Sequence, residues 1–223
     1  MIAAAGSGQR LGAGGPKALV ELGGRPLAAW SLAALGEAST VTAAVVAAPP
    51  GEVERFEAMV AAAGVPLPVK VVAGGESRSE SVSAALAETD ADLVVVHDAA
   101  RPLATADLFD AVVSRLAGDA GCDCAIAAAP ITDTVKEVAE EVVERTLDRS
   151  RLWGAQTPQA FRAVRLREAL SAADSLADAT DDAMLVERIG GRVAIHPAPP
   201  ENIKVTTPLD LRVAGLLLAE RSG

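Results

Sequence analysis

Short apolar runs alternate with stretches of helical periodicity along most of this chain. Runs rich in Val, Ile and Ala predict β-strands near residues 41–47, 69–73, 92–97, 122–128, 192–196 and 202–206. Apolar residues at helical spacing predict α-helices near residues 26–35, 51–63, 77–88, 105–117, 161–173, 180–189 and 207–220. Strands that alternate with helices are typical of βαβ units. We therefore expect an α/β protein with a Rossmann-like, three-layer arrangement, in which helices cover both faces of a mainly parallel sheet.

A different pattern interrupts this alternation between residues 134 and 148. Two short runs of β-forming residues there are separated by Ala139, Glu140 and Glu141, and neither run carries much apolar surface. An isolated two-stranded ribbon is marginally stable in water, so this one must pack against something. We expect a single domain over residues 1–223, with a protruding β-arm as an excursion at about 134–148.

The N-terminal loop carries the strongest chemical signal. Residues 6–8 read Gly-Ser-Gly, and Arg10 and Lys17 follow. Glycines allow the backbone to approach anionic oxygens, successive N–H groups can form a concave anion site, and the two cations add full charge. The spacing fits neither common nucleotide loop, because Gly12 comes one position late for a dinucleotide turn and Pro16 precedes Lys17 where a Walker loop has glycine. The loop therefore predicts a triphosphate site, with a flexible glycine-rich terminus as the alternative.

Polar residues follow the strand predicted at residues 92–97, and ligands of open α/β sheets bind where strands end. Asp98 stands there, and a carboxylate at this place can ligate Mg²⁺ or accept a hydrogen bond from a sugar hydroxyl. A structural pairing with Arg101 is the alternative, and it is compatible with either role. His97 is expected to be a structural hydrogen-bonding residue, and His196 is not expected to be catalytic.

Residues 74–81 follow another predicted strand and open a helix. The Gly74-Gly75 pair would let a ligand approach the backbone, and a serine hydroxyl could meet the edge of a base. The alternative is a purely structural helix N-terminus, in which Ser77 caps the helix and Glu80, three positions later, completes a capping box.

Composition and charge exclude several classes of protein. Aromatic residues make up only 2% of the chain, which argues against base-stacking platforms for single-stranded nucleic acid. The formal net charge of −10 would repel polyanions, so positive charge must be confined to a pocket. No apolar run is long enough to span a membrane and no signal-peptide layout is present, so a cytoplasmic location is expected. Cys122 and Cys124 are expected to be buried free thiols, because a metal site would need two further ligands.

Several short motifs occur in a fixed order along essentially the whole chain. They are Ala3-Ala-Ala-Gly-Ser-Gly-x-Arg10-Leu with Pro16-Lys17, Gly74-Gly75, His97-Asp98-Ala-Ala-Arg101-Pro102, Asp133-Thr134-Val-Lys136, Leu147-Asp148-Arg149, Gln156-Thr157-Pro158-Gln159, Thr180-Asp181-Asp182 and Asn202-Ile-Lys204-Val-Thr206. Together they resemble the 2-C-methyl-D-erythritol 4-phosphate cytidylyltransferases of the non-mevalonate isoprenoid pathway. The resemblance implies a nucleotidyltransferase version of the expected fold, and an enzyme that transfers CMP from CTP to methylerythritol phosphate with release of pyrophosphate.

The resemblance also implies roles for individual residues. Arg10 and Lys17 would stabilise charge on the α-phosphoryl group of CTP and on the leaving pyrophosphate. Arg149 and Lys204 would hold the acceptor's phosphate, and these four are the expected catalytic residues. The residues implied for nucleotide binding are Ala4, Ala5, Gly6, Ser7, Gly8, Gly75, Glu76, Ser81, Asp98 and Ala99. Those implied for acceptor binding are Asp98, Arg101, Thr134, Arg149, Thr157 and Lys204. Mg²⁺ would bridge the CTP phosphates, with Asp98 as a metal ligand or a contact of the polyol.

The chain departs from the family pattern at three places. Only Met1 and Ile2 stand where the family carries several apolar residues and a proline, so the first, central strand is expected to be very short, or truncated with upstream residues missing. Ala18 replaces a glutamine, which affects a detail of the loop and not its cations. Glu76 stands where many relatives carry aspartate or another small polar residue.

In the family that the motifs resemble, an arm like the one predicted here packs against a second subunit. We therefore expect a twofold homodimer in which Thr134 and Arg149 complete the partner's site, with a hairpin folded back on its own domain as the alternative. Arg151 is an alternative to Arg149 as the arginine that binds the acceptor's phosphate, and the resemblance favours Arg149. Two other functions are weighed against the implied one: a cytidylyltransferase for another polyol phosphate, such as ribitol 5-phosphate, and a non-catalytic nucleotide-binding module.

Overall fold

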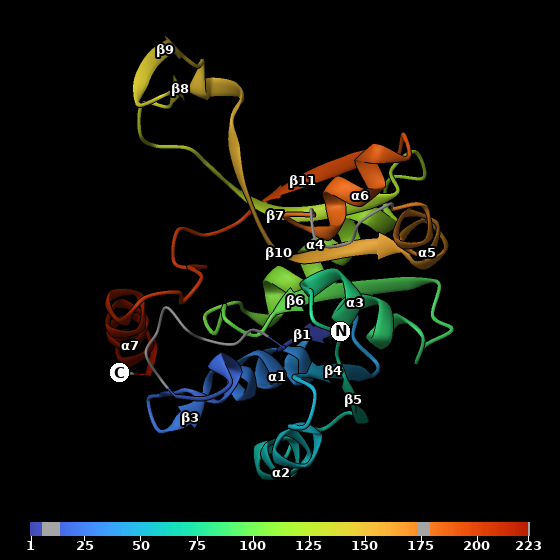
Figure 1. Cartoon of the computed structure of the whole chain (residues 1–223). Helices are drawn as coiled ribbons and strands as arrows, with labels where there is room; N and C mark the ends of the chain where they lie inside the picture. The colour runs from blue at the N-terminus through green and yellow to red at the C-terminus, as the bar shows by residue number, and fades with distance from the viewer. Residues whose placement is uncertain (6–13, 174–178, 223) are drawn as a thin grey trace.

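The computed structural model describes residues 1–5, 14–173 and 179–222. Within these residues the main sheet has seven strands in the order β11-β7-β10-β6-β1-β4-β5 (Figure 1). The strands are β1 (Ile2–Ala3), β4 (Ala44–Ala48), β5 (Val69–Ala73), β6 (Leu93–Asp98), β7 (Cys124–Pro130), β10 (Trp153–Arg162) and β11 (Val193–Pro197). β10 runs antiparallel to β6 and β7, and the other neighbouring pairs are parallel. The expected mainly parallel sheet is confirmed.

Helices cover both faces of this sheet, as the alternating pattern predicts. They are α1 (Leu27–Glu37), α2 (Val53–Ala63), α3 (Arg78–Leu86), α4 (Ala106–Ala117), α5 (Ala163–Ala172), α6 (Asp182–Arg188) and α7 (Pro208–Ser222). Consecutive strand residues point to opposite faces, and Val45 and Val46 of β4 belong to two different hydrophobic clusters. The cluster of Val46 includes α1, α2 and α4, and that of Val45 includes α3, α5 and α6. Because both faces are buried, the strands read as near-continuous apolar runs.

Shorter elements complete the described chain. They are the 3₁₀ turns η2 (Lys17–Leu19) and η3 (Arg149–Arg151) and the two-stranded pair β2 (Glu21–Leu22) and β3 (Arg25–Pro26). A third hydrophobic cluster joins Leu22 of β2, Leu27 of α1 and Ala214 of α7, so α7 is fixed against this pair. None of the described helices is long and apolar enough to cross a membrane.

Strand β1 is only two residues long, yet it lies in the middle of the sheet, as expected. Ile2 is fully buried and pairs in parallel with His97 of β6 and with β4. The same register places Ala3 beside Asp98, and the N–H of Ala99 donates to the carbonyl of Ala3 at 3.2 Å. The chain that leaves β1 toward the predicted phosphate loop therefore passes the carboxyl end of β6, where Asp98 lies.

The predicted β-arm is confirmed as an antiparallel ribbon of β8 (Lys136–Ala139) and β9 (Val142–Thr146). Its turn places Glu140 and Glu141 at φ of 47° and 65°, the left-handed conformation that suits the twist of a tight hairpin. Figure 1 shows the ribbon projecting away from the main sheet, so the hairpin is not folded back onto its own domain. Val138, Val142 and Val143 on the ribbon are 52%, 67% and 55% exposed in the single chain.

Two expectations about strands are wrong. The sequence pattern predicts no strand at β10, because buried positions of that strand include the polar residues Thr157 and Gln159, which conceal the apolar pattern. β10 also takes residues 161 and 162 from the helix expected at 161–173, so α5 begins at Ala163. Residues 202–206 form no strand, because their polar groups bond to loops; for example, the N–H of Val205 donates to the carbonyl of Ala100 at 2.8 Å.

Candidate active site

Asp98, at the carboxyl end of β6, is the centre of a partly buried cluster of charges. Its Oδ2 lies 2.7 Å from the Nζ of Lys204, and its Oδ1 accepts a hydrogen bond of 2.9 Å from the Nε of Arg78. Lys204 comes from the segment before α7, and Arg78 is the first residue of α3. Burial alone would raise the pKa of Asp98, but the charges of Arg78 and Lys204 outweigh it and hold the pKa well below its usual range. The carboxylate is therefore ionised at physiological pH.

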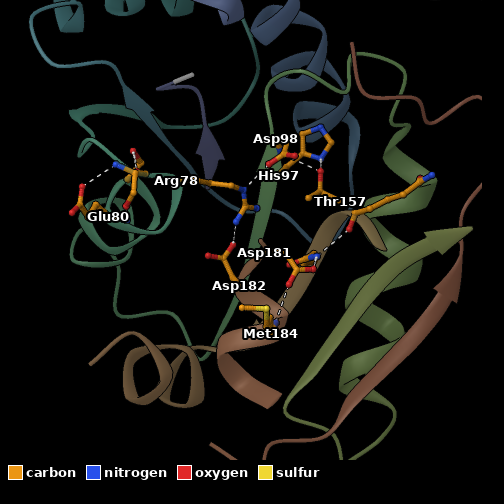
Figure 2. Close-up of polar contacts among 12 residues, drawn as sticks. Arg78, Glu80, His97, Asp98, Thr157, Asp181, Asp182 and Met184 are labelled. Carbon is orange, nitrogen blue, oxygen red and sulfur yellow. Dashed lines mark hydrogen bonds and ion pairs between the residues drawn. The ribbon is translucent and has the colours of Figure 1, made fainter. Parts of the chain in front are cut away.

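A second carboxylate lies on the other side of Arg78 (Figure 2). Asp182, the first residue of α6, is fully buried, and its Oδ2 forms an ion pair with Nη1 of Arg78. The Oδ1 of Asp182 has no hydrogen-bond partner in the described part of the chain. Burial raises the pKa of Asp182, and the positive charge of Arg78 opposes that shift. Arg78 therefore links the carboxyl end of β6 to the N-terminus of α6.

Four buried residues next to Asp98 form a closed ring of hydrogen bonds. The Nε2 of His97 lies 3.2 Å from the carbonyl of Arg101, so this nitrogen carries the proton, and Nδ1 accepts from the hydroxyl of Thr157 at 3.1 Å. Arg101 donates from Nη1 to the carbonyl of Asn202 at 2.8 Å, and Asn202 donates from Nδ2 to the carbonyl of Thr157 at 3.0 Å. The hydroxyl of Thr157 also accepts the backbone N–H of Asp98 at 3.0 Å. The ring therefore fixes the backbone that carries Asp98.

Burial gives the imidazole of His97 a structural role. It lowers the pKa of His97 to about 3, although the charge of Asp98 opposes the shift, so the ring is neutral at physiological pH. Phe109 packs edge-on against the imidazole with a centroid distance of 4.9 Å. The arrangement agrees with the structural hydrogen-bonding role expected for His97. The alternative pairing of Asp98 with Arg101 is not made, because Asp98 pairs with Arg78 and Lys204 instead.

The segment that follows β5 is held by its own hydrogen bonds. The hydroxyl of Ser77 accepts the N–H of Glu80 at 3.1 Å, and the carboxylate of Glu80 accepts the N–H of Ser77 at 2.9 Å, so the capping box is confirmed. Ser81 is fully buried and donates to the carbonyl of Ser77 at 3.0 Å. A Cβ at Gly74 would lie 2.6 Å from the hydroxyl oxygen of Ser81, and one at Gly75 would lie 2.3 Å from the Cβ of Glu80. Glycine is therefore required at both positions by close packing.

The structure brings some of the predicted site residues together and leaves others apart. Asp98, Arg101, Thr157 and Lys204 belong to the charge cluster and its hydrogen-bonded ring, with Ala4 and Ala99 buried beside them. Gly75, Glu76 and Ser81 lie in the segment between β5 and α3, Ala5 ends the first described segment, and Lys17 begins η2. Gly6, Ser7, Gly8 and Arg10 lie outside the described residues.

Thr134 and Arg149 lie at the base of the arm. Arg149 begins η3, and its Nη1 donates to the carbonyl of Thr132. No hydrogen bond or ion pair joins either residue to Asp98 or Lys204 in the described part of the chain. Their roles in an acceptor site therefore stay predictions that a single chain does not test.

Arg78 and Asp182 are the residues of the cluster to which sequence reasoning assigns no role. Their side chains meet although they are 104 positions apart in the chain, and no local pattern predicts such a contact. The one available signal is the Thr180-Asp181-Asp182 motif, which the family resemblance includes without a function for either aspartate.

The charge cluster does not offer a metal ion the donors that it needs. Mg²⁺ prefers several oxygen ligands, but both carboxylate oxygens of Asp98 are paired with cations. Within residues 1–5, 14–173 and 179–222, no group of three or more His, Cys, Asp or Glu side chains could hold a metal. The described residues therefore do not fit a metal site of the protein's own, and ligation by Asp98 would require Arg78 or Lys204 to move.

A mainly parallel sheet with helices on both faces carries a charged site where β1 and β6 end, the place where α/β sheets bind ligands. Its structural neighbours place this fold in the α/β nucleotidyltransferase class. The family model for 2-C-methyl-D-erythritol 4-phosphate cytidylyltransferase matches residues 1–220. The chain therefore belongs to the 2-C-methyl-D-erythritol 4-phosphate cytidylyltransferase family, as its motifs indicate.

Individual relatives agree with this assignment over their whole lengths. The chain is 44% identical over 225 residues to the 2-C-methyl-D-erythritol 4-phosphate cytidylyltransferase of Saccharopolyspora erythraea, and the match covers 98% of each chain. It is similar to the crystal structure of the enzyme of the same name from Thermus thermophilus, with a TM-score of 0.77, 34% identity and coverage of 98% and 97%. The 4-diphosphocytidyl-2C-methyl-D-erythritol synthase of Anaerococcus prevotii gives a TM-score of 0.83 at 26% identity, with coverage of 98% and 96%.

Proposed function

We propose that this chain transfers CMP from CTP to 2-C-methyl-D-erythritol 4-phosphate in isoprenoid precursor biosynthesis. The products are 4-diphosphocytidyl-2-C-methyl-D-erythritol and pyrophosphate. The observation that carries the proposal is the ion pair of Lys204 with Asp98, beside the strand that leads into the predicted triphosphate loop. An ammonium held there is suited to bind the phosphate of one substrate while the loop binds the phosphates of the other.

The reaction brings two anions together, and this sets what the protein must supply. A phosphate oxygen of the acceptor attacks the α-phosphorus of CTP, and the bond to the β-phosphate oxygen breaks as pyrophosphate leaves. The attacking phosphate is already a nucleophile at neutral pH, so no side chain has to serve as one. Catalysis then consists of in-line positioning and neutralisation of charge. We assign Arg10 and Lys17 to the α-phosphoryl group and the leaving pyrophosphate, and Arg149 and Lys204 to the acceptor's phosphate.

The exposure of Lys204 supports its assignment to the acceptor. Its side chain is 42% exposed, whereas the side chain of Asp98 is 10% exposed, so the cation is at the open end of the cluster. An ammonium has three N–H donors, and it can therefore keep Asp98 while it binds a phosphate oxygen. Asp98 would hold the ammonium in place before the acceptor arrives.

We also propose that two chains form a twofold homodimer through the β-arm. The support is the ribbon that projects from the main sheet with three exposed valines, which is costly to leave in water. Thr134 and Arg149 at the base of the arm would then complete the partner's site. An arm of this kind would explain why the single chain leaves both residues without contacts to Lys204.

Magnesium and cellular location complete the proposal. We infer that Mg²⁺ enters as the magnesium complex of CTP, as part of the substrate and not as a metal held by Asp98. A cytoplasmic location is supported by the two cysteines, because Cys122 and Cys124 are both free thiols, as is usual for proteins of a reducing compartment.

The test is pyrophosphate release from CTP and Mg²⁺ with methylerythritol phosphate, with ribitol 5-phosphate and without acceptor. The proposal predicts release with methylerythritol phosphate. Release with ribitol 5-phosphate alone would instead assign the chain to a cytidylyltransferase for another polyol phosphate. If no acceptor gave release, a non-catalytic nucleotide-binding module would be the better account.

A further inference from the structure

The ion pair of Arg78 with Asp182 has no role assigned so far in the proposed reaction, although Arg78 also pairs with Asp98 at the centre of the site. The side chain of Asp182 is fully buried, and that of Arg78 is 23% exposed. A buried ion pair is a weak source of stability, because the cost of removing both charges from water offsets much of their attraction. Such a pair does fix the orientation of both side chains, because a buried charge is stable only where it meets its partner.

The contacts of Arg78 show what is oriented. Its Nη1 is paired with Asp182 and its Nε donates to Asp98, so two different edges of one planar guanidinium are held at once. With Asp182 in place, the guanidinium cannot rotate without losing a buried partner. The Oδ1 of Asp98 is fixed by that guanidinium, and its Oδ2 therefore faces Lys204 in a set direction.

We propose that Asp182 is a positioning residue of this site: through Arg78 it orients the carboxylate of Asp98, and through Asp98 it places the ammonium of Lys204. Only the last step, that Lys204 receives the acceptor's phosphate, rests on the proposed function. We call the four side chains Asp182, Arg78, Asp98 and Lys204 the path. Negative and positive groups alternate along it, from the fully buried Asp182 to the half-exposed Lys204.

The neighbouring aspartate provides a matched control. Asp181 caps α6, with Oδ1 accepting the N–H of Met184 at 2.9 Å, and its Oδ2 accepts from the Nε2 of Gln159 at 2.9 Å. Figure 2 shows Asp181 directed toward Met184 and Asp182 directed toward Arg78. Asparagine is as good a helix cap as aspartate, so Asp181→Asn removes a charge from the same helix and leaves both ion pairs of Arg78 in place. Its Oδ1 can keep the cap to Met184, and the bond that is lost is the one from Gln159.

The first experiment measures kinetic coupling between the two ends of the path. We expect Asp182→Asn to lower kcat/KM for methylerythritol phosphate by about 10- to 100-fold, as displacement of a positioned group does, with KM for CTP within about twofold of wild type. In a Lys204→Met background the same change should cost less than about twofold, because the group that it positions is gone. Asp181→Asn should leave the kinetics of the wild type. Equal losses from Asp182→Asn in both backgrounds would overturn the proposal.

A second variant keeps the test informative if Asp182→Asn does not fold. Arg78→Lys retains the charge, but an ammonium lacks the planar fork that reaches both carboxylates. It is expected to show the same acceptor-specific loss and the same coupling to Lys204→Met. A kcat/KM for the acceptor equal to that of wild type in Arg78→Lys would contradict the proposal.

A readout that needs no activity separates this inference from the proposed function. In nitrogen-15 labelled protein, the Nε–H of Arg78 should give a slowly exchanging resonance, assigned by its absence from Arg78→Lys. We expect the slow exchange to persist in Asp181→Asn and to be lost in Asp182→Asn. If it persists in Asp182→Asn, Asp182 does not position Arg78. If the wild type makes no product while the resonance behaves as expected, the proposed function fails and the positioning role stands.

Discussion

Lys204 and Asp98 belong to segments far apart in the chain, yet the Nζ of Lys204 lies 2.7 Å from the Oδ2 of Asp98. The pair joins the segment before α7 to the end of β6, at the edge of the sheet where ligands of α/β proteins bind. Contacts between these distant segments hold both residues in place. The ring of His97, Arg101, Thr157 and Asn202 holds the two segments together, so the site depends on polar residues buried beneath it.

The hydroxyl of Thr157 provides a first prediction. It donates to His97 and accepts the N–H of Asp98, so Thr157→Val, which keeps the shape, should leave two buried groups unpaired. We expect the free energy of unfolding to fall by about 1–3 kcal/mol. Thr157→Ser retains the hydroxyl and should lose less than half of that amount. Urea denaturation of the three proteins measures this, and equal stability of the Val and Ser variants would count against the ring.

His97 should make the free energy of unfolding fall as the pH falls. Its pKa is about 3 in the folded protein, because burial disfavours the charged ring, and about 6.5 when unfolded. Between these values the unfolded state binds a proton that the folded state does not, so stability falls as pH falls. The contribution is about 1.4 kcal/mol per pH unit between pH 6 and 4.

The variant His97→Gln tests this sign and slope. Glutamine has no group that titrates in this range, so the dependence of its unfolding free energy on pH should be shallower than that of wild type by about 1.4 kcal/mol per unit. Denaturant titrations at pH 6, 5 and 4 give both slopes. Parallel pH dependences would show that His97 is not the group that titrates.

The carboxylate of Asp98 gives a prediction with a different pH window. Its folded pKa lies below the unfolded value of about 3.9, so its stabilisation is complete above about pH 5 and is lost as pH falls through the folded pKa. Asp98→Asn leaves Arg78 and Lys204 without this charge and should cost about 3–5 kcal/mol at pH 7. The difference in unfolding free energy between wild type and Asp98→Asn should be the same at pH 5 as at pH 7, and it should shrink below pH 4. A difference that grew on acidification would contradict the account.

The valines of the arm predict the oligomeric state. Val138 pairs directly with Val143 across the ribbon, so the two share one face. Changing both to Ser should shift the protein from dimer toward monomer in sedimentation velocity, without a change in the fold of the monomer. Val164→Ser is the control, because Val164 is 58% exposed on α5, away from the arm. A wild type that sediments as an active monomer would remove the dimer from the account.

The sequence predicted the parts of the fold that rest on apolar periodicity. The helix expected at 105–117 is α4, and the strand expected at 69–73 is β5. β10 was missed because Thr157 and Gln159 are buried as polar residues, and their burial depends on partners from other segments. Motifs indicated Asp98 and Lys204 as site residues. The pairing of Arg78 with Asp182 could not be predicted, because it too joins distant segments and is visible only in the folded chain.

The central claim is that the ammonium of Lys204 binds the acceptor's phosphate. Steady-state kinetics of Lys204→Met, with methylerythritol phosphate and CTP varied separately, test it most directly, because methionine retains the length of the side chain and removes the charge. The account predicts a loss of about 100- to 1000-fold in kcat/KM for methylerythritol phosphate, with KM for CTP within about twofold of wild type. Unchanged kcat/KM for the acceptor, or a loss confined to CTP, would contradict it.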